Sequence, residues 1–132
     1  GNINITAISI GGAGIYGYTG CTINTLNTCT LTISGFNTGI SAWTGDLIIS
    51  GKGDINVTSN SGSIYSTLAN VSINTSGNIT INSGSTAISA GGTLEISGTG
   101  CINITASPNY AIYAYSTFTN NIANLTANGL IR

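Results

Sequence analysis

The sequence predicts an all-β protein, a single-stranded parallel β-helix (β-solenoid) with three faces, about 24 residues per coil and five to six coils, forming one domain over residues 1–132. Three observations support this prediction. An isoleucine recurs at a nearly constant interval, each interval contains three short segments that alternate apolar and polar residues, and clusters of Gly, Asn and Ser separate these segments. A strict period of this length is the signature of a repeat architecture, in which each unit buries its apolar side chains against its neighbours.

The isoleucine period is the most regular of these features. Successive members lie 25, 24, 24 and 24 residues apart, and their settings are alike, from Gly-Ile-Tyr-Gly in the first to Ala-Ile-Tyr-Ala in the last. We expect the side chains to point inward and to stack from coil to coil. The members of this column are Ile15, Ile40, Ile64, Ile88 and Ile112.

Each period contains three candidate strands, because alternation with a period of two is the strand pattern. The first strand of the first coil contains Ile3 and Ile5. In every coil the second strand contains the repeated isoleucine, and the third strand is represented in the second coil by Leu47 and Ile49. Equivalent strands of neighbouring coils would pair at ~4.8 Å. The coil is longer than that of left-handed hexapeptide solenoids, so we expect a right-handed one. The first coil carries three extra residues around 7–13, and the single proline, Pro108, is expected in a turn.

Charge is scarce in this chain, which has two Lys or Arg, three Asp or Glu, no His and a net charge of −1. Binding to phosphate backbones needs clustered Lys or Arg, so we expect no nucleic-acid partner. No apolar run approaches the ~20 residues that span a bilayer, so we expect no membrane insertion. Gly1 starts directly in a repeat-like segment, which indicates a mature or excised chain. Solubility from neutral polar groups is typical of extracellular repeat proteins, so we expect an extracellular or cell-surface location.

The residues that catalysis requires are missing from the repeats. The carboxylates Asp46, Asp54 and Glu95 fall in different columns of the repeat, and without His no Ser–His or Cys–His pair is available. The stretch Gly11-Gly12-Ala13-Gly14 does not match a phosphate loop, and no helix follows it. We therefore expect no enzyme activity, no cofactor and no metal site.

Aromatic residues gather on the second face. One place after the repeated isoleucine the column reads Tyr16, Ser41, Tyr65, Ser89 and Tyr113, and three places after it reads Tyr18, Trp43, Thr67, Gly91 and Tyr115. Six of the nine aromatic residues therefore share one outward face. A patch of exposed rings usually marks a contact surface, for sugar rings or for another subunit. The alternative is that the rings cover backbone and stabilise each other along the ladder. The candidate binding residues are Tyr16, Tyr18, Trp43, Tyr65, Tyr113 and Tyr115.

The first face is polar on its outer side. Its outward columns read Asn4, Thr32, Asn56, Thr80 and Asn103, and then Thr6, Ser34, Thr58, Asn82 and Thr105. One interpretation is a solvated face whose side chains hydrogen-bond along the ladder. Another is a flat Thr/Asn array that orders water and binds ice.

The cysteines are odd in number, at positions 21, 29 and 101. Cys21 and Cys29 share the parity of inward residues and are separated by one corner, so a disulfide between them is one interpretation. Cys101 takes an outward position, as a free thiol or an intermolecular link. Three idle thiols are the remaining alternative, and the lack of His makes a zinc site a poor match.

Two coils resemble a known family. The segment from Gly77 to Ile81 and the segment from Ala87 to Ile104 are similar to the repeat of clostridial-type cell-surface carbohydrate-binding proteins, whose β-helix is like that of polysaccharide lyases. The resemblance implies an extracellular location, polysaccharide binding and calcium. This chain lacks the repeated Asp and Asn-Asp turns that would hold calcium.

Two kinds of function then compete. Repeat-like sequence runs to both ends, so the first hypothesis is a structural subunit that stacks head to tail into a fibre, appendage or surface layer. The residues expected to take part are Ile3, Ile5, Leu125 and Cys101. The alternatives are a carbohydrate-binding module or adhesin using the aromatic face, and an ice-binding protein using the Thr/Asn face. The sequence favours self-assembly over polysaccharide binding by a small margin.

Overall fold

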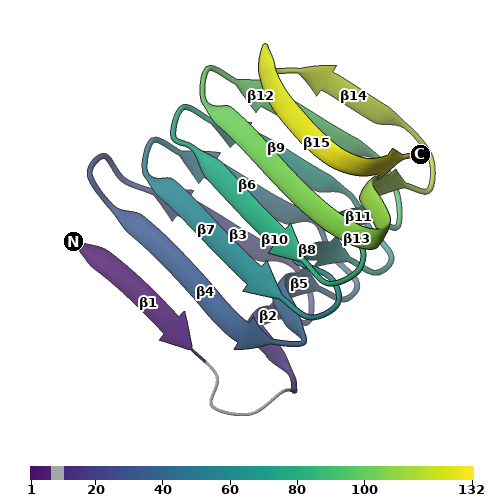
Figure 1. The fold of residues 1–132 in the computed structure, drawn as a ribbon, viewed down its shortest axis with the longest axis horizontal. Coiled ribbons are helices and arrows are strands. Elements are labelled where there is room, and N and C mark those ends of the chain that lie inside the picture. Colours follow the sequence, from purple (N-terminus) through teal and green to yellow (C-terminus); the bar gives the residue numbers. More distant parts are fainter. Residues whose placement is uncertain (7–10) are drawn as a thin grey trace.

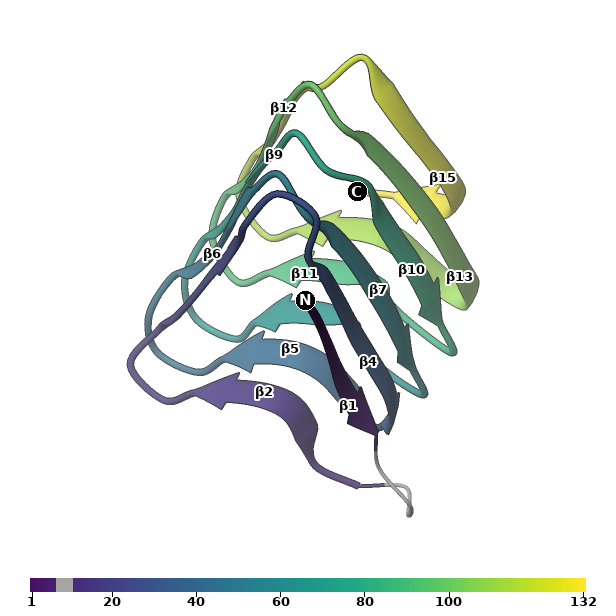
Figure 2. The same ribbon diagram turned by 90° about the vertical axis from the view of Figure 1, so that its left-hand side faces the viewer.

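The computed structural model of the protein describes residues 1–6 and 11–132, and within these residues it has fifteen strands and no helix. The strands wind into a three-sided parallel β-solenoid of about five turns, as predicted (Figure 1). Figure 2 looks from the amino-terminal end, where the coils are roughly triangular. The chain runs clockwise in this view as it recedes, so the solenoid is right-handed.

Each face contains one strand from nearly every coil, and every pairing between coils is parallel. The first face consists of β1 (Asn2–Thr6), β4 (Thr30–Phe36), β7 (Asp54–Ser59), β10 (Ile79–Ser83), the first part of β13 (Cys101–Ala114) and β15 (Asn124–Ile131). The second consists of β2 (Ala13–Gly17), β5 (Thr38–Ala42), β8 (Ile64–Ser66), β11 (Ile88–Ala90) and the last parts of β13 and β15. The third consists of β3 (Cys21–Thr25), β6 (Leu47–Gly51), β9 (Val71–Thr75), β12 (Leu94–Gly98) and β14 (Phe118–Asn121).

The repeated isoleucines form the predicted column. Their Cα atoms are in register from Ile15 to Ile112 along the second face, and the four members from Ile40 onward are fully buried. Ile131 continues the column opposite Ile112. The inward positions of the other two faces complete one apolar core that runs the length of the solenoid. Side chains that stack on their own equivalents in the next coil explain why the 24-residue spacing is so strict.

The corner between the first and second faces of the last full coil differs from the prediction. Pro108 was expected in a turn, but it lies within β13, which continues round this corner. The pairing of β13 with β15 shifts register between Thr105 and Tyr110, and this irregularity accommodates a residue that has no N–H to donate. In the first coil, residues 7–10 of the expected insertion around 7–13 lie outside the described residues.

Glycines stack where the third face turns into the first, and one of them gives a test of the coil geometry. A Cβ added to Gly77 would collide with the carbonyl oxygen of Gly53, and one added to Gly100 would collide with that of Gly77. We expect Gly77→Ala to destabilise the fold by about 1–3 kcal/mol, the usual cost of overpacking a close contact. The matched control is Gly62→Ala, whose new Cβ would meet its nearest atom at 3.7 Å. Equal urea midpoints for the two variants would contradict the stacking.

Candidate functional site

The register of the second face brings the predicted tyrosines into one line. Tyr16 lies opposite Ser41, Ser41 opposite Tyr65, Tyr65 opposite Ser89, and Ser89 opposite Tyr113. Tyrosine and serine therefore alternate from coil to coil. Because neighbouring strands are ~4.8 Å apart, successive tyrosines are separated by roughly twice that distance along the solenoid axis. We call this line the tyrosine column.

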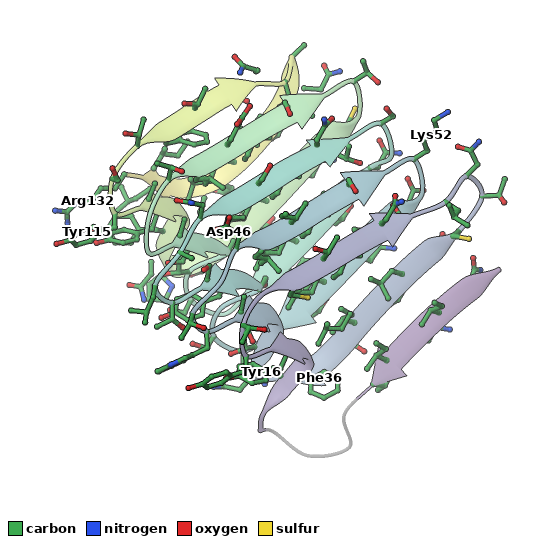
Figure 3. The ribbon with its side chains drawn as sticks, turned by 180° about the vertical axis from the view of Figure 1, so that it is seen from behind. Tyr16, Phe36, Asp46, Lys52, Tyr115 and Arg132 are labelled. Carbon is green, nitrogen blue, oxygen red and sulfur yellow. The ribbon has the colours of Figure 1, made fainter. Side chains whose placement is uncertain are left out.

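The remaining aromatics border this column. Tyr18, Trp43 and Tyr115 follow the last residues of β2, β5 and β13, so they stand in the turn after the strand. Their exposed fractions are 63%, 45% and 77%. The ladder continues into this turn, since the amide of Trp43 donates to the carbonyl of Gly17 at 3.0 Å. Figure 3 shows Tyr16 and Tyr115 on the same side of the molecule, at opposite ends of the solenoid, with Lys52 at a distant corner.

Two hollows open between the tyrosines, each above a serine. The first, which we call the Ser41 hollow, has a volume of about 470 Å³ and is lined by Gly12, Ala13, Tyr16, Thr38, Ser41, Ala42, Trp43, Tyr65 and Thr67. The second, the Ser89 hollow, has a volume of about 350 Å³ and is lined by Tyr65, Ser66, Thr67, Leu68, Ser89, Ala90, Gly91, Tyr113 and Tyr115. Small side chains in alternate coils thus leave open hollows that the larger rings border.

A third hollow of about 320 Å³ lies at the neighbouring corner and is rich in hydroxyl groups. Its lining is Thr38, Ser61, Gly62, Tyr65, Ser85, Thr86 and Ser89. Tyr65 is the one residue that lines all three hollows. The sequence placed Tyr65 on the face but gave no reason to rank it above the other tyrosines.

The hollows are uncharged. Among the residues that the structure describes, none that lines a hollow is Asp, Glu, Lys or Arg. A cation borders the column at one end, where the Arg132 guanidinium lies 5.8 Å from the centroid of the Tyr113 ring. Hydrogen bonding to Tyr110 raises the pKa of Arg132, so the side chain stays protonated. The face therefore suits a neutral ligand that offers hydroxyl and C–H groups.

The repeat pattern did not predict that Tyr110 lies beside the aromatic face. Its ring centroid is 5.4 Å from that of Tyr113, with a tilt of 54° between the planes. It precedes the repeated isoleucine Ile112 by two residues, a position occupied by Thr38 in β5. The irregular corner of β13 sets its position, and a comparison of repeats does not predict such a corner.

Two of the three carboxylates, Asp46 and Asp54, accept hydrogen bonds from residues of the next coil. Asp46 Oδ1 accepts hydrogen bonds from the backbone amide and from the side-chain amide of Asn70, both at 3.1 Å. Asn70 Oδ1 in turn accepts from the backbone N and from Oγ1 of Thr93, both at 2.9 Å. Asp54 Oδ1 accepts from the amide of Asn78 at 2.8 Å. These acids tie successive coils together, and residues 1–6 and 11–132 contain no group of three or more His, Cys, Asp or Glu side chains placed to hold a metal ion.

The cysteines are three half-buried free thiols, so the Cys21–Cys29 disulfide is not formed in this structure. Cys21 begins β3 opposite Leu47, and its burial raises the pKa of the thiol. Cys29 lies instead beside the first strand, where its Sγ is 3.7 Å from the amino-terminal nitrogen of Gly1. Cys101 begins β13 opposite Asn124, which places it one coil inside the last strand.

The strands at the two ends of the described solenoid expose apolar side chains. Ile3 in β1 is 60% exposed, while Ile5 and Leu125 are partly buried against the core. In β15, Leu130 and Ile131 are 62% and 52% exposed. Among the candidate assembly residues, Ile3 is therefore exposed, whereas Ile5, Leu125 and Cys101 are partly buried.

The first face has the predicted outward columns, in register from β1 to β15. In the first of these two columns, the asparagines Asn4, Asn56 and Asn103 are exposed, and the threonines Thr32 and Thr80 between them are half-buried. The two kinds of side chain alternate along the solenoid. Ice binding by this face stays a prediction.

Comparison of the chain with protein-family models, with curated proteins and with solved structures finds no match. The resemblance of residues 77–81 and 87–104 to clostridial-type carbohydrate-binding β-helices therefore stays a prediction. The described residues include no helix able to cross a bilayer.

Proposed function

We propose that this protein is a non-enzymatic, extracellular β-solenoid that binds a polysaccharide through its aromatic face. The observation that supports this proposal is the tyrosine column, whose rings frame two uncharged hollows of about 470 and 350 Å³. Aromatic rings present an apolar face to the C–H groups of a sugar, while the Tyr hydroxyl is free to hydrogen-bond. The serines and threonines of the same hollows add further hydroxyl groups.

The hollows are the reason for ranking sugar binding above self-assembly. Their size falls at the lower end of the ~300–1,000 Å³ range of ligand pockets, and their lining mixes aromatic and small polar side chains as such pockets do. Two of the carboxylates that a lyase or hydrolase would need, Asp46 and Asp54, are engaged in coil-to-coil hydrogen bonds. A binding function therefore fits better than catalysis.

Retention on insoluble polysaccharides tests the proposal. The wild-type protein should be retained on at least one of cellulose, xylan, mannan or chitin. A variant with Tyr16, Trp43, Tyr65 and Tyr113 all replaced by Ala should pass through. The control carries Asn56→Ala and Thr80→Ala on the first face and should be retained like the wild type. Retention of the aromatic variant, or passage of the wild type through every matrix, would contradict sugar binding by this face.

End-to-end assembly is the second candidate, and the exposed apolar side chains of the end strands favour it. Ile3, Leu130 and Ile131 are each more than half exposed, on strands that have a free edge in this structure. Unpaired strand edges are ready to pair with another coil, either of the same polypeptide or of a second copy. Filaments in negative-stain images that disappear in Ile5→Lys or Leu125→Lys would support this function. Monomers at high concentration would contradict it.

A further inference from the structure

We infer that the ligand of the aromatic face is an extended, neutral, 1,4-linked β-glycan that lies along the solenoid axis, across the strands, with every second sugar in a hollow. This inference rests on the proposed function and deepens it. It is carried by the spacing of the hollows rather than by the chemistry of any single residue.

The Ser41 and Ser89 hollows are two copies of one arrangement. Each has a serine as its floor and a tyrosine from the coil on either side as its walls: Tyr16 and Tyr65 in the first, Tyr65 and Tyr113 in the second. The two floors lie two coils apart on the same face. Two steps of the ~4.8 Å strand spacing therefore separate equivalent points of the two hollows.

A 1,4-linked β-glycan has a matching period. In its extended form each sugar is turned over relative to its neighbours, so the same side of the chain recurs at every second residue. The length of this two-sugar repeat is close to twice the ~4.8 Å spacing of the strands. Such a chain can place one sugar in the Ser41 hollow and the next but one in the Ser89 hollow, with the intervening sugar over Tyr65. An α-1,4-linked chain curves into a coil and cannot follow a straight column.

The charges around the hollows further restrict the class of glycan that they can bind. The described residues that line both hollows include no cationic side chain that would pair with a uronate or sulfate, and Lys52 stands at a distant corner (Figure 3). Arg132 lies near Tyr113 at the end of the column, outside the lining of the Ser89 hollow. A neutral chain is therefore favoured over an acidic one, whose desolvated charges would find no partner there.

Calorimetric titration with oligosaccharides of increasing length tests this geometry. The probes are β-1,4-linked gluco-, xylo-, manno- and N-acetylglucosamine oligosaccharides from the disaccharide to the hexasaccharide, with the α-1,4-linked gluco-series as the control. A trisaccharide is the shortest chain that reaches both hollows. In at least one β-series the affinity should therefore rise roughly tenfold or more between di- and trisaccharide, because the second contact becomes intramolecular. The α-series should show no such step.

Ser89→Tyr provides the matched variant, because the two flanking members of its column are already tyrosines. The added ring fills the Ser89 hollow, so the rise between di- and trisaccharide should vanish while the disaccharide affinity changes by about twofold or less, as expected for the loss of one of two equal sites. Asn56→Ala, on the exposed side of the first face, should keep the rise, and near-wild-type melting of both variants excludes misfolding.

The possible results distinguish failure of the proposed binding geometry from failure of the proposed sugar-binding function. Binding without a length step, equal binding of α- and β-series, or a step that survives in Ser89→Tyr would overturn the proposed geometry and leave sugar binding intact. If no oligosaccharide and no insoluble polysaccharide binds, the proposed function itself fails.

Discussion

Replacing Tyr65 with serine should weaken glycan binding about thirtyfold or more, which corresponds to about 2 kcal/mol for a central contact residue. The reason is the position of Tyr65 relative to the hollows. Tyr65 lines all three hollows, and its ring forms the wall shared by the two on the tyrosine column. Serine is the replacement of choice, because the column already carries serine in the coils on either side, at Ser41 and Ser89. The measurement is the dissociation constant of the best trisaccharide by calorimetry.

Two controls make the Tyr65 result specific. Tyr18→Ser removes an exposed ring of the same kind that lies outside the linings of the three hollows, so its dissociation constant should stay within about twofold of the wild type. Tyr65→Phe keeps the ring and loses the hydroxyl, which separates stacking from hydrogen bonding. If Tyr18→Ser weakens binding as much as Tyr65→Ser, the hollows are not the site.

Replacing Ile64 with alanine should lower the free energy of unfolding by about 2–5 kcal/mol, which is the usual cost of deleting a buried isoleucine side chain. Ile64 is fully buried in β8, with Ile40 on one side of it in the column and Ile88 on the other. The cavity left by alanine would be enclosed by rigid coils that cannot close over it. Urea denaturation followed by circular dichroism measures the loss.

The same column supplies the control for Ile64. Ile131 occupies an equivalent place opposite Ile112, but it is 52% exposed at the end of β15. Ile131→Ala should therefore cost about 1 kcal/mol or less. Ile64→Val should cost about 0.5–1.5 kcal/mol, since it removes a single methylene. Similar losses for Ile64→Ala and Ile131→Ala would show that stacking from both sides does not determine stability.

Most of the fold could be predicted from the sequence because every coil packs its inward side chains in the same way. An inward residue must match its equivalent in the next coil, so spacing alone fixes the register of columns such as Ile40, Ile64 and Ile88. The alternation of strand residues then fixes which side chains face outward. The tyrosine column followed directly from these two rules.

The remaining features depend on contacts that the repeat does not encode. The path of β13 round the corner at Pro108, and with it the contact of Tyr110 with Tyr113, comes from a local irregularity of a single coil. The hollows depend on the relative sizes of side chains in adjacent coils. Ser41 shows this, since it takes the predicted outward position and is nevertheless only 6% exposed between its tyrosine neighbours.

The most direct test of the central claim is a map of the amide signals that shift when the best trisaccharide is titrated into labelled protein and followed by two-dimensional NMR. Binding in the hollows predicts that the largest shifts fall on the second face, around Ser41, Tyr65 and Ser89. Little change should occur at Asn56 or Thr80 on the first face. Largest shifts on the first face or at the end strands, or a spectrum unchanged at saturating sugar, would contradict the assignment of the aromatic face as the binding site.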